Sequence, residues 1–151
     1  MTLPQPWPRV LRAALLSGAL ASLASAAVLA WRGRHDARDA AAPLNGPSQW
    51  VWGRGAPSKR GFSAKYTVVG YVIHHIAATF WAALYERARA QRKPALPLAI
   101  ATAAMANVVD YTLTPKRLEP GYERQISRKS LALAYAAFAL GLAAGALAQR
   151  R

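Results

Sequence analysis

Long apolar stretches alternate with short basic segments along this chain. Each stretch holds close to 20 residues and few charges: Ala13–Trp31, Tyr66–Tyr85, Ala95–Leu113 and Ser130–Ala148. An α-helix rises about 1.5 Å per residue, so about 20 residues cross a hydrocarbon core about 30 Å thick. The pattern therefore predicts an all-α fold, an integral membrane bundle of four transmembrane helices, with residues 1–151 forming a single domain.

The apolar positions also predict which helix faces meet. At the 100° spacing of a helix, the second stretch has one bulky apolar face that we expect to contact lipid: Val69, Ile73, Ile76, Phe80 and Leu84. The other stretches carry stripes of small residues, including Gly141-x-x-x-Gly145. Small residues let membrane helices approach closely, so the stripes predict a compact bundle. Whether one stripe instead binds a second copy or another membrane protein stays open.

The connections between the stretches differ in character. Residues 32–65 begin basic and continue with many Pro and Gly residues, which argues against a long helix. Two interpretations stay open for this segment: an interfacial loop that lies on or dips into the membrane, and an ordinary exposed loop. Residues 87–93 form a short basic turn before Pro94, which predicts an antiparallel hairpin of the second and third helices.

Aromatic residues near the ends of the stretches are candidate interface anchors. Amphipathic rings are favoured at the depth of the lipid head groups. The predicted anchors are Trp31, Trp50, Trp52, Trp81 and Tyr85. Glu86 follows directly and can cap the next turn by pairing with Arg89 or Arg92.

The charge of the chain lies outside the apolar stretches. Lys and Arg number 20 against 6 Asp and Glu, and they cluster where the stretches end. A soluble nucleic-acid-binding protein gathers its charge on one continuous face, so we expect no nucleic-acid partner. The clusters favour membrane lipids with anionic head groups, at about 1 kcal/mol per basic residue near the surface. The total count of basic residues and their local density favour opposite orientations, so the orientation in the membrane is not decided.

The N-terminal stretch has a second interpretation. Arg9 and Arg12 precede the apolar residues, and Ala24-Ser25-Ala26 has the small-x-small pattern of a signal-peptidase site. Removal of residues 1–26 would leave three spans. The apolar run continues to Trp31 and a basic cluster, which favours a retained span.

Polar residues at membrane depth are the candidate functional residues. They form a candidate intramembrane polar site that comprises Tyr71, His74, His75, Asn107 and Asp110. An ionisable group there costs about 2.5–3.5 kcal/mol on insertion scales, so it usually has a partner or a role. In an antiparallel hairpin Asp110 is level with Tyr71, which makes the Tyr71 hydroxyl its expected partner.

Two hypotheses follow for these residues. In the first, Asn107 and Asp110 are hydrogen-bonding groups that fix helix packing, with Asp110 tied to Lys65, Lys116 or Arg117 near the interface. In the second, Asp110, Tyr71 and a histidine form a proton or ion relay, because histidine titrates near neutral pH.

Metal-dependent and nucleophilic chemistry have weak support. His74 and His75 are adjacent, so their side chains point about 100° apart on a helix and do not easily share one ion. The chain has no cysteine, which excludes thiolate sites and covalent haem attachment. Thr79 follows His75 by four residues, but one such pair is a poor indicator of a nucleophile. We therefore expect no metal, no cofactor and no enzymatic activity.

The segment from Tyr71 to Tyr135 contains several distinctive motifs. They are His74-His75, Phe80-Trp-Ala-Ala-Leu-Tyr-Glu86, Val108-Val-Asp-Tyr-x-Leu-Thr-Pro-Lys-Arg-Leu-x-Pro-Gly-Tyr-Glu123 and Ser127-Arg-Lys-Ser-Leu131. These motifs loosely resemble those of small YagU-like bacterial inner-membrane proteins of unknown function, and the resemblance covers the last three spans. The resemblance implies a multi-pass helical protein of the bacterial inner membrane and carries no catalytic residues with it. The expected function is a structural or accessory one, and the alternative is a proton- or ion-coupled transport component.

Overall fold

The computed structural model describes residues 6–91 and 93–149, and the described chain is helical without strands. Its long helices are α1 (Trp7–Asp36), α4 (Val69–Arg89), α5 (Ala95–Val108) and α6 (Arg128–Ala148). A π-helical turn, Ala64–Val68, leads into α4, and another, Val109–Leu113, extends α5. Each of the four resulting segments is long and apolar enough to cross a membrane. The predicted all-α fold with four candidate spans is confirmed, although α1 begins six residues earlier than expected and ends five later.

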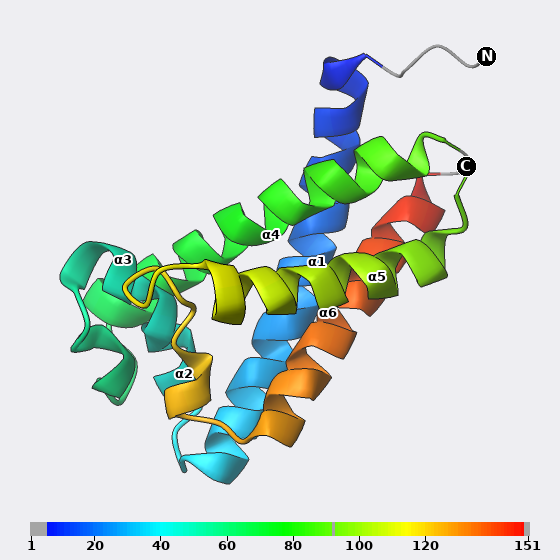
Figure 1. Ribbon diagram of the computed structural model, residues 1–151. Helices are drawn as coiled ribbons and strands as arrows, with labels where there is room; N and C mark the ends of the chain where they lie inside the picture. The colour runs from blue at the N-terminus through cyan, green and yellow to red at the C-terminus, as the bar shows by residue number, and fades with distance from the viewer. Residues whose placement is uncertain (1–5, 92, 150–151) are drawn as a thin grey trace.

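The first and last long helices, α1 and α6, form the centre of the bundle. α1 packs most extensively against α6 and α4, while α5 packs mainly against α6. In Figure 1, α4 and α5 run in opposite directions and cross the pair of α1 and α6. The turn between α4 and α5 is short, as the sequence predicts. However, α4 contacts α1 more than it contacts α5, and α5 contacts α6 more than it contacts α4.

Small residues set the distances between the central helices. A Cβ atom on Gly145 would lie 2.5 Å from the Cα atom of Ser17, and one on Gly18 would lie 2.8 Å from the Cα atom of Thr79. Gly141 meets the backbone of Ala21 in the same way. These contacts confirm the small-residue stripes of the first and last spans as helix interfaces. On the predicted lipid face of α4, Ile76, Phe80 and Leu84 are exposed.

The connection between α1 and α4 is more ordered than either sequence interpretation implies. It forms the short helices α2 (Ala42–Asn45) and α3 (Gln49–Trp52) and the 3-10 turns Gly46–Ser48 and Ala56–Ser58. Residues 42, 43 and 45–49 are buried, because this segment packs against the start of α4 and against the 114–127 connection with its 3-10 turn Tyr122–Arg124. Figure 1 shows α2, α3 and the 114–127 connection gathered at one end of the bundle.

Buried and half-buried polar side chains hold this connection in place. The Asn45 amide donates to the carbonyls of Lys59 (3.0 Å) and Gly61 (3.1 Å), and its oxygen accepts from the Thr67 hydroxyl at 2.6 Å. The Asp39 carboxylate accepts from the backbone N–H groups of Gly61 and Ala41. Burial alone would raise the pKa of Asp39, but these hydrogen bonds outweigh it and hold the pKa below its ordinary value.

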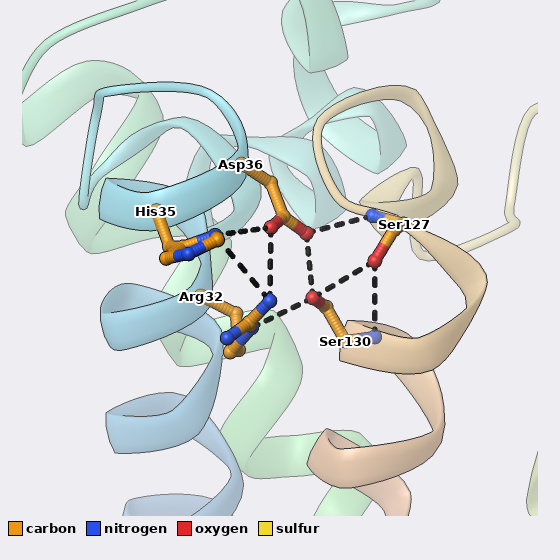
Figure 2. A network of polar contacts seen from close by, with 5 residues as sticks. All are labelled: Arg32, His35, Asp36, Ser127 and Ser130. Carbon is orange, nitrogen blue, oxygen red and sulfur yellow. Dashed lines mark hydrogen bonds and ion pairs between the residues drawn. The ribbon is translucent and has the colours of Figure 1, made fainter.

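A polar cluster joins the end of α1 to the start of α6 (Figure 2). One Asp36 carboxylate oxygen accepts from Arg32 at 3.1 Å, and the other accepts from the Ser130 hydroxyl at 2.5 Å and the Ser127 backbone N–H at 2.9 Å. Ser127 caps α6 by accepting from the Ser130 N–H. Residues 32–36 therefore continue α1 instead of opening the loop, and the network explains why the helix extends beyond its apolar stretch.

The predicted aromatic anchors separate into two groups. Trp31, Trp50 and Trp52 are exposed, and Trp81 is half-buried. The anchor prediction is wrong for Tyr85, which is only 1% exposed and donates its hydroxyl to the Ala95 carbonyl at 3.1 Å. Tyr85 lies on the face of α4 that points into the bundle, so it joins α4 to the start of α5.

Candidate intramembrane polar site

His75 and Tyr71 of α4 meet a serine of α1. The Ser22 hydroxyl lies 2.7 Å from Nδ1 of His75 and 3.1 Å from the Tyr71 hydroxyl. Ser22 is fully buried on the small-residue stripe that lets α1 and α4 approach. The three side chains therefore form one hydrogen-bonded group across the α1–α4 interface.

His74 has partners on two elements other than its own helix. Its Nε2 lies 2.9 Å from the Ser25 hydroxyl and 3.3 Å from the Ser22 carbonyl, and its Nδ1 lies 2.7 Å from the Tyr122 hydroxyl. A carbonyl only accepts, and the Ser25 hydroxyl already donates to the Ala21 carbonyl at 2.7 Å. This pattern assigns a proton to Nε2, and in the neutral form of the ring Nδ1 then accepts from the Tyr122 hydroxyl.

Tyr122 comes from the connection before α6 and was not predicted as a site residue. Its ring is 6% exposed, and burial raises the pKa of its hydroxyl above the ordinary value, which keeps it protonated as a donor. The preceding Gly121 has φ +80° and packs against Pro57, so the turn that places Tyr122 depends on glycine. The Pro120-Gly121 turn in the sequence indicates a change of chain direction here, but not that the next side chain reaches His74.

Asp110 pairs with a different tyrosine from the one predicted. The Tyr135 hydroxyl of α6 donates to Oδ2 of Asp110 at 2.5 Å, whereas Tyr71 contacts Ser22. The predicted Asp110–Tyr71 pair is therefore wrong. The physical reason is that α5 packs mainly against α6, which brings Asp110 within hydrogen-bonding reach of Tyr135. Lys65, Lys116 and Arg117, the other partners considered, do not hydrogen-bond to Asp110 in the described residues; Lys116 instead pairs with Glu119 at 2.8 Å.

A small cavity brings part of the predicted site together. It has a volume of about 70 Å³ and lies where α1, α4, α5 and α6 meet the two long connections. Its polar lining comprises Ser25, His74, Asp110, Tyr122 and Tyr135, surrounded by apolar and aromatic side chains. A cavity needs about 10–15 Å³ to hold one water, so this one has room for a few. His74 and Asp110 therefore border the same space without touching each other.

The remaining predicted residues lie elsewhere. His75 and Tyr71 do not line this cavity, because they face Ser22 on the other edge of α4. Asn107 lines a cleft between α5 and α6, and no hydrogen bond joins its side chain to another described residue, so the predicted hydrogen-bonding role in packing finds no support for Asn107. The Thr79 hydroxyl donates to the backbone carbonyl of His75 at 2.9 Å, so this bond does not pair it with the His75 ring. Within the described ranges, three or more His, Cys, Asp or Glu side chains do not gather as a metal site would require.

A second buried polar group surrounds Glu86, which is 4% exposed. Its carboxylate accepts from the Ser17 hydroxyl, from Nε of Arg89 at 2.8 Å and from the Gln149 amide at 3.5 Å. The predicted pairing of Glu86 with Arg89 is confirmed, but the carboxylate is buried between α1 and the end of α6 instead of lying at the surface. The interior role was missed because Glu86 stands beside a run of basic residues in the sequence.

The serines of this site give a prediction about N-terminal processing. Ser22 and Ser25 lie within residues 1–26, in the middle of α1, and hydrogen-bond to both histidines. Signal-peptide removal would leave two histidine side chains without these partners at membrane depth. We expect the intact mass of the chain purified from a bacterial host to show that residues 2–26 are retained, with or without Met1. A mass that corresponds to a start at Ala27 would contradict the described site.

Comparisons of the chain with protein-family models, with curated proteins and with solved structures find no match.

Proposed function

We propose that this chain is a non-enzymatic accessory protein of the bacterial inner membrane, in which the intramembrane polar residues hold the helices in register. The observation that carries the proposal is that His74, His75 and Asp110 each hydrogen-bond to another element of the bundle. Interhelical hydrogen bonds average about 0.6 kcal/mol in membrane proteins, and they specify which faces meet. The bacterial inner membrane as its location is supported by the YagU-like resemblance and by the basic clusters at the span ends.

A second candidate function is proton- or ion-coupled transport. The observation that favours it is the cavity of about 70 Å³ that His74 and Asp110 both border. A few waters in this space could join two titratable groups, which is the arrangement that a proton relay needs. His75 and Tyr71, which the sequence hypothesis placed in the relay, lie outside the cavity lining.

Asp110→Asn distinguishes the two functions. Asparagine keeps an oxygen that accepts from Tyr135, so the accessory function predicts a loss of stability below about 1 kcal/mol, the scale of one such bond. It also predicts that proteoliposomes of the wild-type chain and of Asp110→Asn dissipate an imposed pH gradient no faster than empty vesicles. The measurement uses an internal pH-sensitive dye, with valinomycin and potassium to remove the charge imbalance.

The matched control is Glu123→Gln, which neutralises an exposed carboxylate outside the cavity. Faster proton flux through the wild-type chain, lost in Asp110→Asn and kept in Glu123→Gln, would overturn the accessory function in favour of transport.

A further inference from the structure

A cleft lies between α5 and α6. Its volume is about 960 Å³, and its walls are mainly apolar side chains of the two helices, among them Leu96, Ile100, Ala104, Ala136 and Leu140. The small side chains of alanines on both helices leave this space unfilled, while Ile100 and Leu140, which also line the cleft, are exposed. Both helices are candidate membrane spans, so the cleft faces hydrocarbon.

One end of the cleft is polar and carries both signs of charge. Tyr111, Glu123 and Arg128 line it, from the last turn of the third span, the following connection and the first residue of α6. Residues at the ends of spans lie at the depth of the lipid head groups. In the described part of the chain, neither Glu123 nor Arg128 forms an ion pair, and the buried Tyr111 hydroxyl has no hydrogen-bond partner.

We propose that this cleft binds one phospholipid whose head group carries a phosphate and a primary ammonium group. The Arg128 guanidinium binds the phosphate, and the Glu123 carboxylate accepts from the ammonium. An acyl chain fills the apolar part of the cleft between α5 and α6. The cleft shares only Tyr135 with the lining of the His74–Asp110 cavity, and the proposal does not depend on the accessory function.

The two charges decide among lipid classes. A phosphatidylglycerol head group has hydroxyl donors but no cation, so it leaves the Glu123 carboxylate without an opposite charge. A phosphatidylcholine head group has a cation but no N–H, so it cannot donate to the carboxylate. Phosphatidylethanolamine satisfies both side chains, and it is the lipid that we expect to remain bound.

Native mass spectrometry of the detergent-purified chain tests this site. The chain is incubated with equal amounts of the three lipids, and lipid adducts are measured at increasing collision energy. We expect phosphatidylethanolamine adducts to exceed each of the other two by about tenfold, the effect of one charge-assisted hydrogen bond. Arg128→Gln should lower phosphatidylethanolamine retention about tenfold, whereas Lys129→Gln, an exposed neighbour that does not line the cleft, should leave it unchanged.

Two further variants separate the head group from the acyl chain. Glu123→Gln should remove the preference for phosphatidylethanolamine over phosphatidylcholine. Ala136→Phe, which fills the cleft, should reduce retention of every lipid, whereas Ala144→Phe on an exposed part of α6 outside the cleft should not. Equal retention in Arg128→Gln and Lys129→Gln, a wild-type preference for phosphatidylglycerol, or equal effects of the two phenylalanine variants would overturn the proposal. The side chains exchanged are exposed, and circular dichroism verifies that each variant stays folded.

Discussion

Gly145→Val is expected to lower the free energy of unfolding by about 3 kcal/mol, near the upper end of the cost of overpacking. Gly145 approaches the Cα atom of Ser17 so closely that even one added carbon would lie 2.5 Å from it. Backbone atoms cannot rotate away as a side-chain end can, so α6 must separate from α1. For a chain of this size the loss corresponds to a fall in Tm of about 6–12 °C.

The control for this prediction is Ala144→Val, one residue earlier on an exposed part of α6. It adds a similar apolar group and the same β-branching, and we expect a change within about 0.5 kcal/mol, as for surface substitutions generally. Thermal unfolding of both variants in the same detergent provides the measurement. A similar fall in Tm for the two would mean that the close α1–α6 contact does not determine stability.

Glu86→Ala is expected to cost about 2–3 kcal/mol, below the 3–5 kcal/mol typical of breaking a fully buried ion pair. The change leaves Ser17, Arg89 and Gln149 without their shared acceptor. The Arg89 side chain is 20% exposed and can partly turn to water, which is why the cost falls below the fully buried value.

Two other variants define the origin of this loss. Glu86→Gln keeps an oxygen that accepts from Ser17 and should recover part of the stability, while Glu123→Gln should change it little because that carboxylate is exposed. Thermal unfolding at constant ionic strength provides the comparison. If Glu86→Ala is as stable as Glu123→Gln, the buried cluster does not support the α1–α4 interface.

The helices could be predicted from sequence because each depends on local information. The length of an apolar stretch and the spacing of its small residues are fixed by bilayer thickness and helix geometry. The 37–63 connection could not be predicted, because its burial depends on distant contacts such as Gly46 against Pro120 and Gly70 against Leu44. The extension of α1 to Asp36 likewise depends on Ser127 and Ser130, about 90 residues later in the chain.

The candidate site was predicted in part for a similar reason. The cost of ionisable groups at membrane depth points to His74 and Asp110, and both border one cavity. Their partners could not be predicted, because depth along a span says nothing about which neighbour a helix faces. Tyr135 near the start of its span has the pattern of an interface anchor, yet α5 turns Asp110 towards it. Tyr85 was misassigned by the same pattern.

A double-mutant cycle on Asp110 and Tyr135 measures whether polar residues at membrane depth join the helices. Asp110→Ala, Tyr135→Phe and the double variant are compared with the wild type by equilibrium unfolding in detergent. A hydrogen bond that joins α5 to α6 predicts a coupling of about 0.6–1.7 kcal/mol, from the average to the maximum measured for interhelical hydrogen bonds. Additive effects within about 0.3–0.5 kcal/mol would mean that the two side chains act independently, and would contradict it.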